Sequence, residues 1–283
     1  MQGGSTPHSF SFRPSQASAL ETADVIFWIG PELETFLQTP LQNLAGDAKV
    51  ITLENLDGLE RQARREGDEF EAHDHDEDHD DHAKHEDEHA EKDHDHEHKE
   101  AHDGHHGHEH DSELDTHIWL DPENAAVMVS AIADTLSKID PANASHYAAN
   151  AKSTQDRLAG LTKDISASLA PVKDKPFVVF HDAYQAFETR FGIAAIGSLT
   201  INPQIKPGAE RIDQIQKKIR SLSAVCVFSE PQFKSSLVDV IIEGTDASQG
   251  VLDPLGATLD DGPELYFSLL KNMANSFHDC LKS

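Results

Sequence analysis

Long apolar runs, positive charge and cysteine pairs are all scarce in this chain of 283 residues. No stretch of 18 apolar residues occurs, so no segment is expected to cross a bilayer as a helix. Lysine and arginine number 23 against 51 acidic residues, which gives a formal net charge of −28. A field of that sign repels nucleic-acid phosphates and anionic lipid, so neither nucleic-acid binding nor direct membrane insertion is expected.

The sequence motifs of P-loop proteins, dinucleotide-binding folds and serine hydrolases are also missing. Only Cys226 and Cys280 occur, without the C-x-x-C spacing that indicates a cysteine-based zinc site or a redox centre. Two free buried thiols and a single disulfide in an oxidising compartment both fit this usage. The residues alone leave these two alternatives open.

Histidine is the residue in excess: there are 19, and 14 of them fall within 71–111. This segment also holds 18 acidic residues and three lysines, but no aromatic residue and no aliphatic residue larger than alanine. It cannot bury a core, so it is predicted to be a disordered insertion between two patterned regions. Its imidazoles and carboxylates predict weak auxiliary sites for transition metals. The histidines concerned are His73, His75, His79, His82, His85, His89, His94, His96, His98, His102, His105, His106, His108 and His110.

Outside the insertion, short apolar runs alternate with stretches of helical spacing. Strands are predicted at 25–29, 49–53, 176–180, 194–199, 224–228 and 250–252. Helices are predicted at 13–24, 31–37, 122–138, 182–191, 208–222, 235–243 and 263–281. A further helical stretch, 141–169, would span about 42 Å and could join two halves of the molecule.

This alternation predicts an α/β fold with two lobes of mostly parallel sheets joined by one long helix. The N-terminal lobe is predicted at 1–138, with the insertion at 71–111 inside it. The linker helix is predicted at 139–170 and the C-terminal lobe at 171–283.

Five histidines lie outside the insertion, and three of them stand at the edges of predicted elements: His8, His117 and His181. Parallel sheets place functional groups at the carboxyl ends of strands, which is where His181 falls. Zinc sites commonly combine three protein ligands, often imidazoles, with a fourth oxygen. Asp253, just after the last short strand, is the candidate carboxylate ligand, and a simple turn-forming Asp-Pro is the alternative.

The chain resembles the ZnuA-type zinc-binding proteins, members of the cluster A-I metal-binding family and periplasmic components of bacterial zinc ABC transporters. The resemblance runs in order along nearly the whole chain and includes the histidine-rich insertion. The segments that carry it are 8–15 (HSFSFRPS), 23–34 (ADVIFWIGPELE), 117–122 (HIWLDP), 180–184 (FHDAY), 202–209 (NPQIKPGA), 226–233 (CVFSEPQF), 252–256 (LDPLG) and 280–282 (CLK).

The resemblance implies zinc held in the cleft between the lobes by three histidines, His8, His117 and His181. It also implies a disulfide between Cys226 and Cys280. Some zinc-binding members carry a glutamate directly before the first histidine, where this chain has Pro7. Asp253, which falls where related manganese binders place a carboxylate, or a water is therefore expected to complete the shell.

Members of the family also carry a signal peptide and a strand–helix unit before the first histidine. His8 stands almost at the start of this sequence, so the first lobe is expected to lack one strand.

The function expected on this basis is that of a monomeric, non-enzymatic periplasmic carrier that captures Zn²⁺ and delivers it to an ABC permease. The insertion is expected to recruit zinc, and affinity is expected to fall below about pH 6 as imidazole gains a proton. Three alternatives are a manganese or iron carrier of the same fold, a zinc hydrolase with Glu230 or Asp182 as its base, and a metal buffer acting through the insertion alone.

Overall fold

The computed structural model describes residues 10, 13–65, 70, 114–200, 208–232 and 236–282. His8, the predicted first zinc ligand, and the whole histidine-rich insertion at 71–111 lie outside these ranges. The predictions made for them are therefore not tested by the structure.

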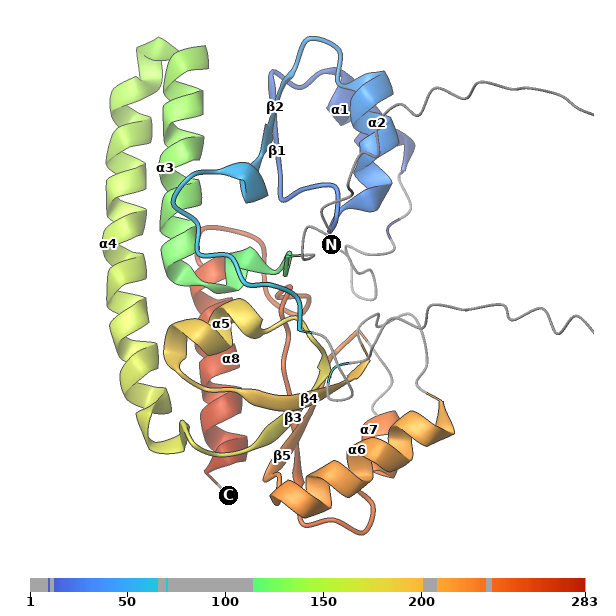
Figure 1. Cartoon of the computed structure of the whole chain (residues 1–283). Helices are drawn as coiled ribbons and strands as arrows, with labels where there is room; N and C mark the ends of the chain where they lie inside the picture. Colours follow the sequence, from blue (N-terminus) through green and yellow to red (C-terminus); the bar gives the residue numbers. More distant parts are fainter. Residues whose placement is uncertain are drawn as a thin grey trace, which may run out of the picture.

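The N-terminal part contains a small parallel sheet of two strands, β1 (Val25–Trp28) and β2 (Lys49–Thr52). The strands pair in register from Val25 opposite Lys49 to Trp28 opposite Thr52, and the indole Nε1 of Trp28 donates to the Thr52 hydroxyl at 2.9 Å. Two short helices, α1 (Pro14–Glu21) and α2 (Gln38–Leu44), lie beside the sheet (Figure 1). The predicted strands at 25–29 and 49–53 are thus confirmed to within a residue.

The helix predicted at 31–37 is wrong, because the helical turns begin later, with a 3₁₀ turn at Thr35–Leu37 followed by α2. The side chain of Glu34 accepts a hydrogen bond from the backbone N–H of Ile29 at 2.7 Å. A side chain that bonds local backbone in this way favours a turn over a helix.

Two long helices run side by side along one flank of the molecule (Figure 1). They are α3 (Pro122–Ile139) and α4 (Ala144–Leu169), and α4, with 26 residues, is about 39 Å long. The buried residues of α4 recur at helical spacing: Leu158, Leu161, Ile165 and Leu169. This apolar stripe lets α4 pack on both α3 and the final helix α8 (Leu265–Leu281), so one rigid helix links the two ends of the fold.

The C-terminal part is built on a four-stranded sheet in the order β4-β3-β5-β6, with every neighbouring pair parallel. The strands are β3 (Phe177–His181), β4 (Ala195–Thr200), β5 (Cys226–Ser229) and β6 (Ser248–Val251). Helices α5 (Gln185–Phe191) and α8 lie on one face, and α6 (Ala209–Leu222) and α7 (Ser236–Ile242) on the other (Figure 1).

Successive residues of β3 feed the cores on the two faces of this sheet. Phe177 and Val179 join the core formed with α4, α5 and α8, whereas Val178 and Phe180 join the one formed with α6 and α7. Because both faces are covered, β3 is buried along its whole length, as expected for a parallel strand.

The α/β fold class, with mostly parallel sheets and one long helix, is confirmed. The lobe boundaries at 138/139 and 170/171 stay a prediction. Within the described part of the chain, no helix is both long and apolar enough to cross a membrane. Parallel strands expose their carboxyl ends at one edge, and the segments that follow β3, β5 and β6 there carry the candidate site.

Candidate metal centre

His181 is the last residue of β3, and only 4% of it is exposed. Its Nδ1 lies 2.6 Å from Oε1 of Glu230, which follows β5, the strand next to β3. The buried hydroxyl of Tyr184 donates to the same carboxylate oxygen at 2.9 Å. Glu230 therefore fixes the orientation of the His181 ring from the adjacent strand.

His117 is held in the same way by a carboxylate two residues earlier. Its Nδ1 lies 2.7 Å from Oδ1 of Asp115, and its backbone N–H donates to that oxygen at 3.1 Å. His117 is 7% exposed and directly precedes the 3₁₀ turn Ile118–Leu120, which leads into α3. Asp121 then caps α3 by accepting from the Glu123 N–H at 2.8 Å, so the segment that carries His117 is anchored at both ends.

The two imidazoles lie together, with ring centroids 5.3 Å apart and planes inclined at 67°. A carboxylate accepts a hydrogen bond from each Nδ1, so each neutral ring carries its proton there and keeps a lone pair on Nε2. Carboxylate–histidine pairs of this kind fix the tautomer and raise the basicity of a metal-ligating nitrogen. Two buried, oriented nitrogen donors at this spacing are suited to sharing one metal ion.

Burial and neighbouring charges shift the pKa values of His181 and of Asp115. Burial lowers the pKa of His181. The charge of Glu230 and the hydrogen bond to it raise that pKa by more than burial lowers it, so the net shift is upward. Burial raises the pKa of Asp115, and the charge of His117 and the bonds to it outweigh burial and lower that pKa. The upward shift of the His181 pKa fits a more basic nitrogen donor at that position.

Asp253 lies in the loop that follows β6, at the same edge of the sheet. Its Oδ1 accepts from the Leu255 N–H at 3.1 Å and from Nε2 of Gln232 at 3.2 Å. The first of these bonds is the local turn that an Asp-Pro sequence favours. Its Oδ2 is buried without a hydrogen-bond partner, and burial of an unsatisfied carboxylate oxygen is costly. Asp253 thus keeps one oxygen free for a donor or a cation.

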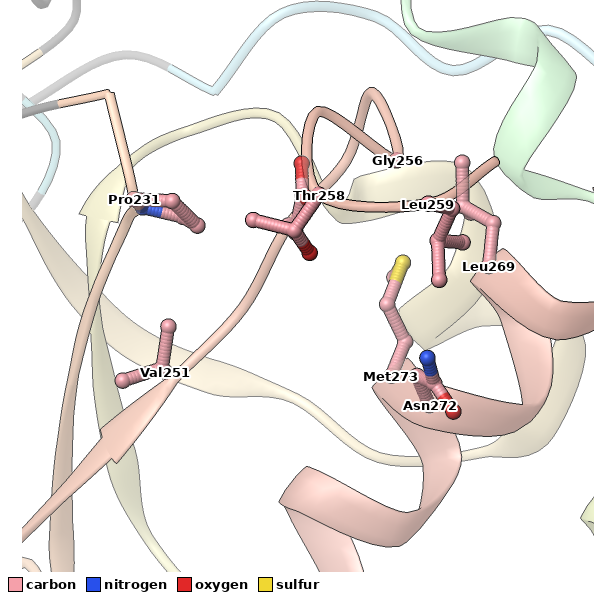
Figure 2. Close-up of a pocket in the computed structure, with 9 residues that line it drawn as sticks. Pro231, Val251, Gly256, Thr258, Leu259, Leu269, Asn272 and Met273 are labelled. Atoms are coloured by element: carbon pink, nitrogen blue, oxygen red, sulfur yellow. The ribbon is translucent and has the colours of Figure 1, made fainter. Parts of the chain in front are cut away.

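This loop is coupled to the His117 segment, because the indole Nε1 of Trp119 donates to the Pro254 carbonyl at 3.0 Å. A cavity of about 220 Å³ opens beside Asp253, between β6 and α8 (Figure 2). The side chains of Pro231, Thr258 and Met273 face one another across it.

The structure thus brings together two of the four predicted ligands and places Asp253 on the neighbouring loop. No group of three or more His, Cys, Asp or Glu residues arranged to hold a metal occurs among the described residues. His8 and the 14 histidines of the insertion lie outside them, so the complete ligand set stays a prediction. His146 is exposed on α4, and His278, on α8, pairs with Asp279 at 3.1 Å, as expected for surface positions.

Sequence reasoning missed the orienting role of Asp115 and Glu230. The first had a local signal, an acidic residue two positions before His117. Glu230 was identified only as a base for the hydrolase alternative. Its pairing with His181 depends on which strands are neighbours, and an apolar strand pattern does not show that.

A disulfide joins Cys226 on β5 to Cys280 on α8, with Cα atoms 5.9 Å apart. The disulfide predicted from the resemblance is confirmed. It ties the final helix to the strand that leads directly into Glu230.

Comparisons with known proteins agree along the chain. The family model described as "Zinc-uptake complex component A periplasmic" matches residues 1–280. The high-affinity zinc uptake system protein ZnuA of Brucella abortus is 53% identical over 281 residues, which cover 99% of this chain and 84% of the relative. The protein of the same name from Yersinia pestis is 36% identical over 287 residues, covering 99% of this chain and 82% of the relative.

A solved structure described as the crystal structure of ZnuA shares the fold, with a TM-score of 0.73 at 21% identity, over 99% of this chain and 88% of that one. The family predicted from the sequence segments is therefore confirmed. The chain belongs to the ZnuA family of zinc-uptake complex components.

Proposed function

We propose that this chain captures Zn²⁺ with the imidazoles of His8, His117 and His181 and delivers it to the permease of an ABC transporter. The observation that carries the proposal is the pair of buried rings, His117 and His181, whose centroids lie 5.3 Å apart and whose Nδ1 atoms each contact a carboxylate. Membership of a zinc-uptake family supports zinc as the cargo.

The donor set favours zinc over the alternative cargoes. Imidazole nitrogen suits Zn²⁺, whereas manganese prefers sites rich in carboxylate and water. The two nearest carboxylates, Asp115 and Glu230, are each bonded to an imidazole Nδ1. Asp253 or a water is proposed as the fourth ligand, and the free Oδ2 of Asp253 supports the first of these. A competition titration in which excess Mn²⁺ displaced Zn²⁺ would favour the manganese or iron carrier instead.

The two bases considered for the hydrolase alternative, Glu230 and Asp182, are both engaged by neighbouring side chains. Glu230 accepts from both His181 and Tyr184, and Asp182 is engaged by Arg65. The family is one of binding components, so the prediction that the chain is not an enzyme is confirmed.

The finer assignments extend this proposal. A family described as periplasmic supports capture of zinc in the periplasm, and the carrier is proposed to act there as a monomer. The proposed division of labour gives the histidine-rich segment 71–111 the recruitment of zinc and the three-histidine site its tight binding.

Deletion of 71–111 separates the carrier from a buffer that works through the insertion alone. Ala63 and Leu114 form an antiparallel bridge, so the chain on the two sides of the insertion already runs side by side and a short linker can close the gap. We expect isothermal titration to show one tight zinc site in the deletion variant and loss of the weaker sites that the intact chain adds. A variant without any tight site would support the buffer.

Zinc affinity should fall in mild acid, because protons compete for the imidazole nitrogens. The pKa of His181 is raised from its ordinary value of 6.5, so the loss should begin above pH 6.5 and grow as the pH falls. With one or more imidazoles to deprotonate, we expect affinity at pH 5 to be at least about tenfold weaker than at pH 7.5. Equal affinities at the two pH values, measured by calorimetry, would rule out a histidine shell.

A further inference from the structure

We propose that Arg65 is a positioning residue for metal capture, which clamps the segment of His117 to the segment of His181 and so fixes the spacing of the two imidazoles. The inference rests on the proposed function and deepens it. No ligand role is assigned to Arg65 itself.

The guanidinium of Arg65 serves two buried carboxylates at once. Its Nε donates to Oδ2 of Asp182 at 3.0 Å and its Nη2 to the other oxygen of Asp182. Its Nη1 donates to Oε2 of Glu188 at 2.7 Å. The Asp182 and Glu188 side chains are only 4% and 3% exposed, and the ring of Phe70 lies 4.2 Å below the guanidinium carbon. Water is largely excluded, which strengthens a forked ion pair of this kind.

One end of the clamp leads directly to His181. Asp182 is its neighbour in sequence, and Glu188 lies on α5, the helix that begins four residues after His181. The other end leads to His117, because Ala63 bridges to Leu114 and the Asp115 N–H donates to the Gln62 carbonyl at 2.9 Å. Asp115 then bonds both the ring and the backbone of His117.

At this edge the Arg65 fork acts beside one further tie between the same segments, the hydrogen bond that Nε2 of Gln185 donates to the Ala63 carbonyl at 2.9 Å. Metal affinity depends on ligands held within about 0.5 Å of the productive geometry, since ordering them on binding costs free energy. Arginine suits this task because its rigid fork binds two carboxylates, which the point charge of lysine does not reproduce.

Arg157 on α4 offers a control outside the two histidine segments. Its Nη2 donates to Oε1 and Oε2 of Glu264 at 2.7 and 2.6 Å, and its guanidinium carbon lies 3.7 Å from the centroid of the Phe267 ring. Arg157 therefore ties α4 to the start of α8, and among the described residues no hydrogen bond joins it to the segment of His117 or of His181.

The test compares zinc dissociation constants and dissociation rates of the full chain carrying Arg65→Met, Arg65→Lys or Arg157→Met. We expect Arg65→Met to weaken zinc binding by about tenfold or more, mainly through faster dissociation, and Arg65→Lys to recover part of the loss. Arg157→Met should stay within about threefold of the intact chain, even where it lowers the melting temperature. The visible spectrum of bound Co²⁺ should change in Arg65→Met and not in Arg157→Met, which a general loss of stability would not produce.

Arg65→Met leaves two buried carboxylates without their cation, which can prevent folding. The triple variant R65M/D182N/E188Q removes that charge imbalance and still lacks the fork, so it should show the same loss of affinity. Wild-type affinity in either folded variant would overturn the role of Arg65. Absence of a tight zinc site in the unaltered chain would instead refute the proposed function.

Discussion

Replacing His181 by alanine is expected to abolish the tight zinc site, with affinity falling by more than about 100-fold. Loss of an orienting partner alone typically costs about 10- to 100-fold in metal affinity, and this change removes a donor itself. The substitution also removes the His181 ring from the buried Glu230 carboxylate, which keeps the hydrogen bond from the Tyr184 hydroxyl. The measurement is a zinc titration of the folded variant in competition with a chelator of known affinity.

His146→Ala is the matched control for this substitution. His146 is an exposed residue of α4 and should bind zinc no better than any surface histidine, so its loss should leave the tight site unchanged. Weak binding attributed to 71–111 should persist in both variants. Retention of the tight site in His181→Ala would contradict the ligand assignment.

Removal of the Cys226–Cys280 disulfide is expected to lower the free energy of unfolding by about 4 kcal/mol. The bridge closes a loop with a sequence separation of 54 residues, and loop-closure entropy for that length predicts a loss of this size. The bond also joins two buried positions, on β5 and on α8, where α8 packs against α4. The measurement is urea denaturation of the Cys226→Ala/Cys280→Ala variant beside the oxidised chain.

Reduction of the unaltered chain provides the control for that comparison. The reduced chain should lose about as much stability as the double variant, because both lose the same cross-link. An unchanged denaturation midpoint in both would show that the bridge does not limit the unfolded state.

β3 was predictable because it is a short apolar run, and burial of both faces demands such a run, whereas β1 is an apolar run that is only half-buried. Val25–Trp28 and Phe177–His181 differ from the predicted ranges by at most one residue at either end. The helix predicted from Pro31 was wrong because the Glu34 side chain bonds the Ile29 backbone, a contact that helical spacing does not reveal. Helical spacing also did not reveal where the long helix begins, which is at Ala144, after a 3₁₀ turn at Pro141–Asn143.

The site itself was only partly predictable. His181 was recognisable from its place at the end of a strand, and His117 from its place at the edge of the patterned region after the insertion. Their approach to one another was not predictable, because tertiary contacts such as those of Arg65 with Asp182 and of Trp119 with Pro254 leave no pattern in the sequence. Residues that orient ligands across strands become visible only once the strand order is known.

A crystal structure of the full chain loaded with one equivalent of zinc, phased to locate the metal by its anomalous signal, tests the central claim most directly. We predict one strong zinc peak with the Nε2 atoms of His8, His117 and His181 each at about 2.0–2.1 Å, and a single oxygen in the fourth position. A zinc ion bound elsewhere, or any of these three rings outside its shell, would contradict the account.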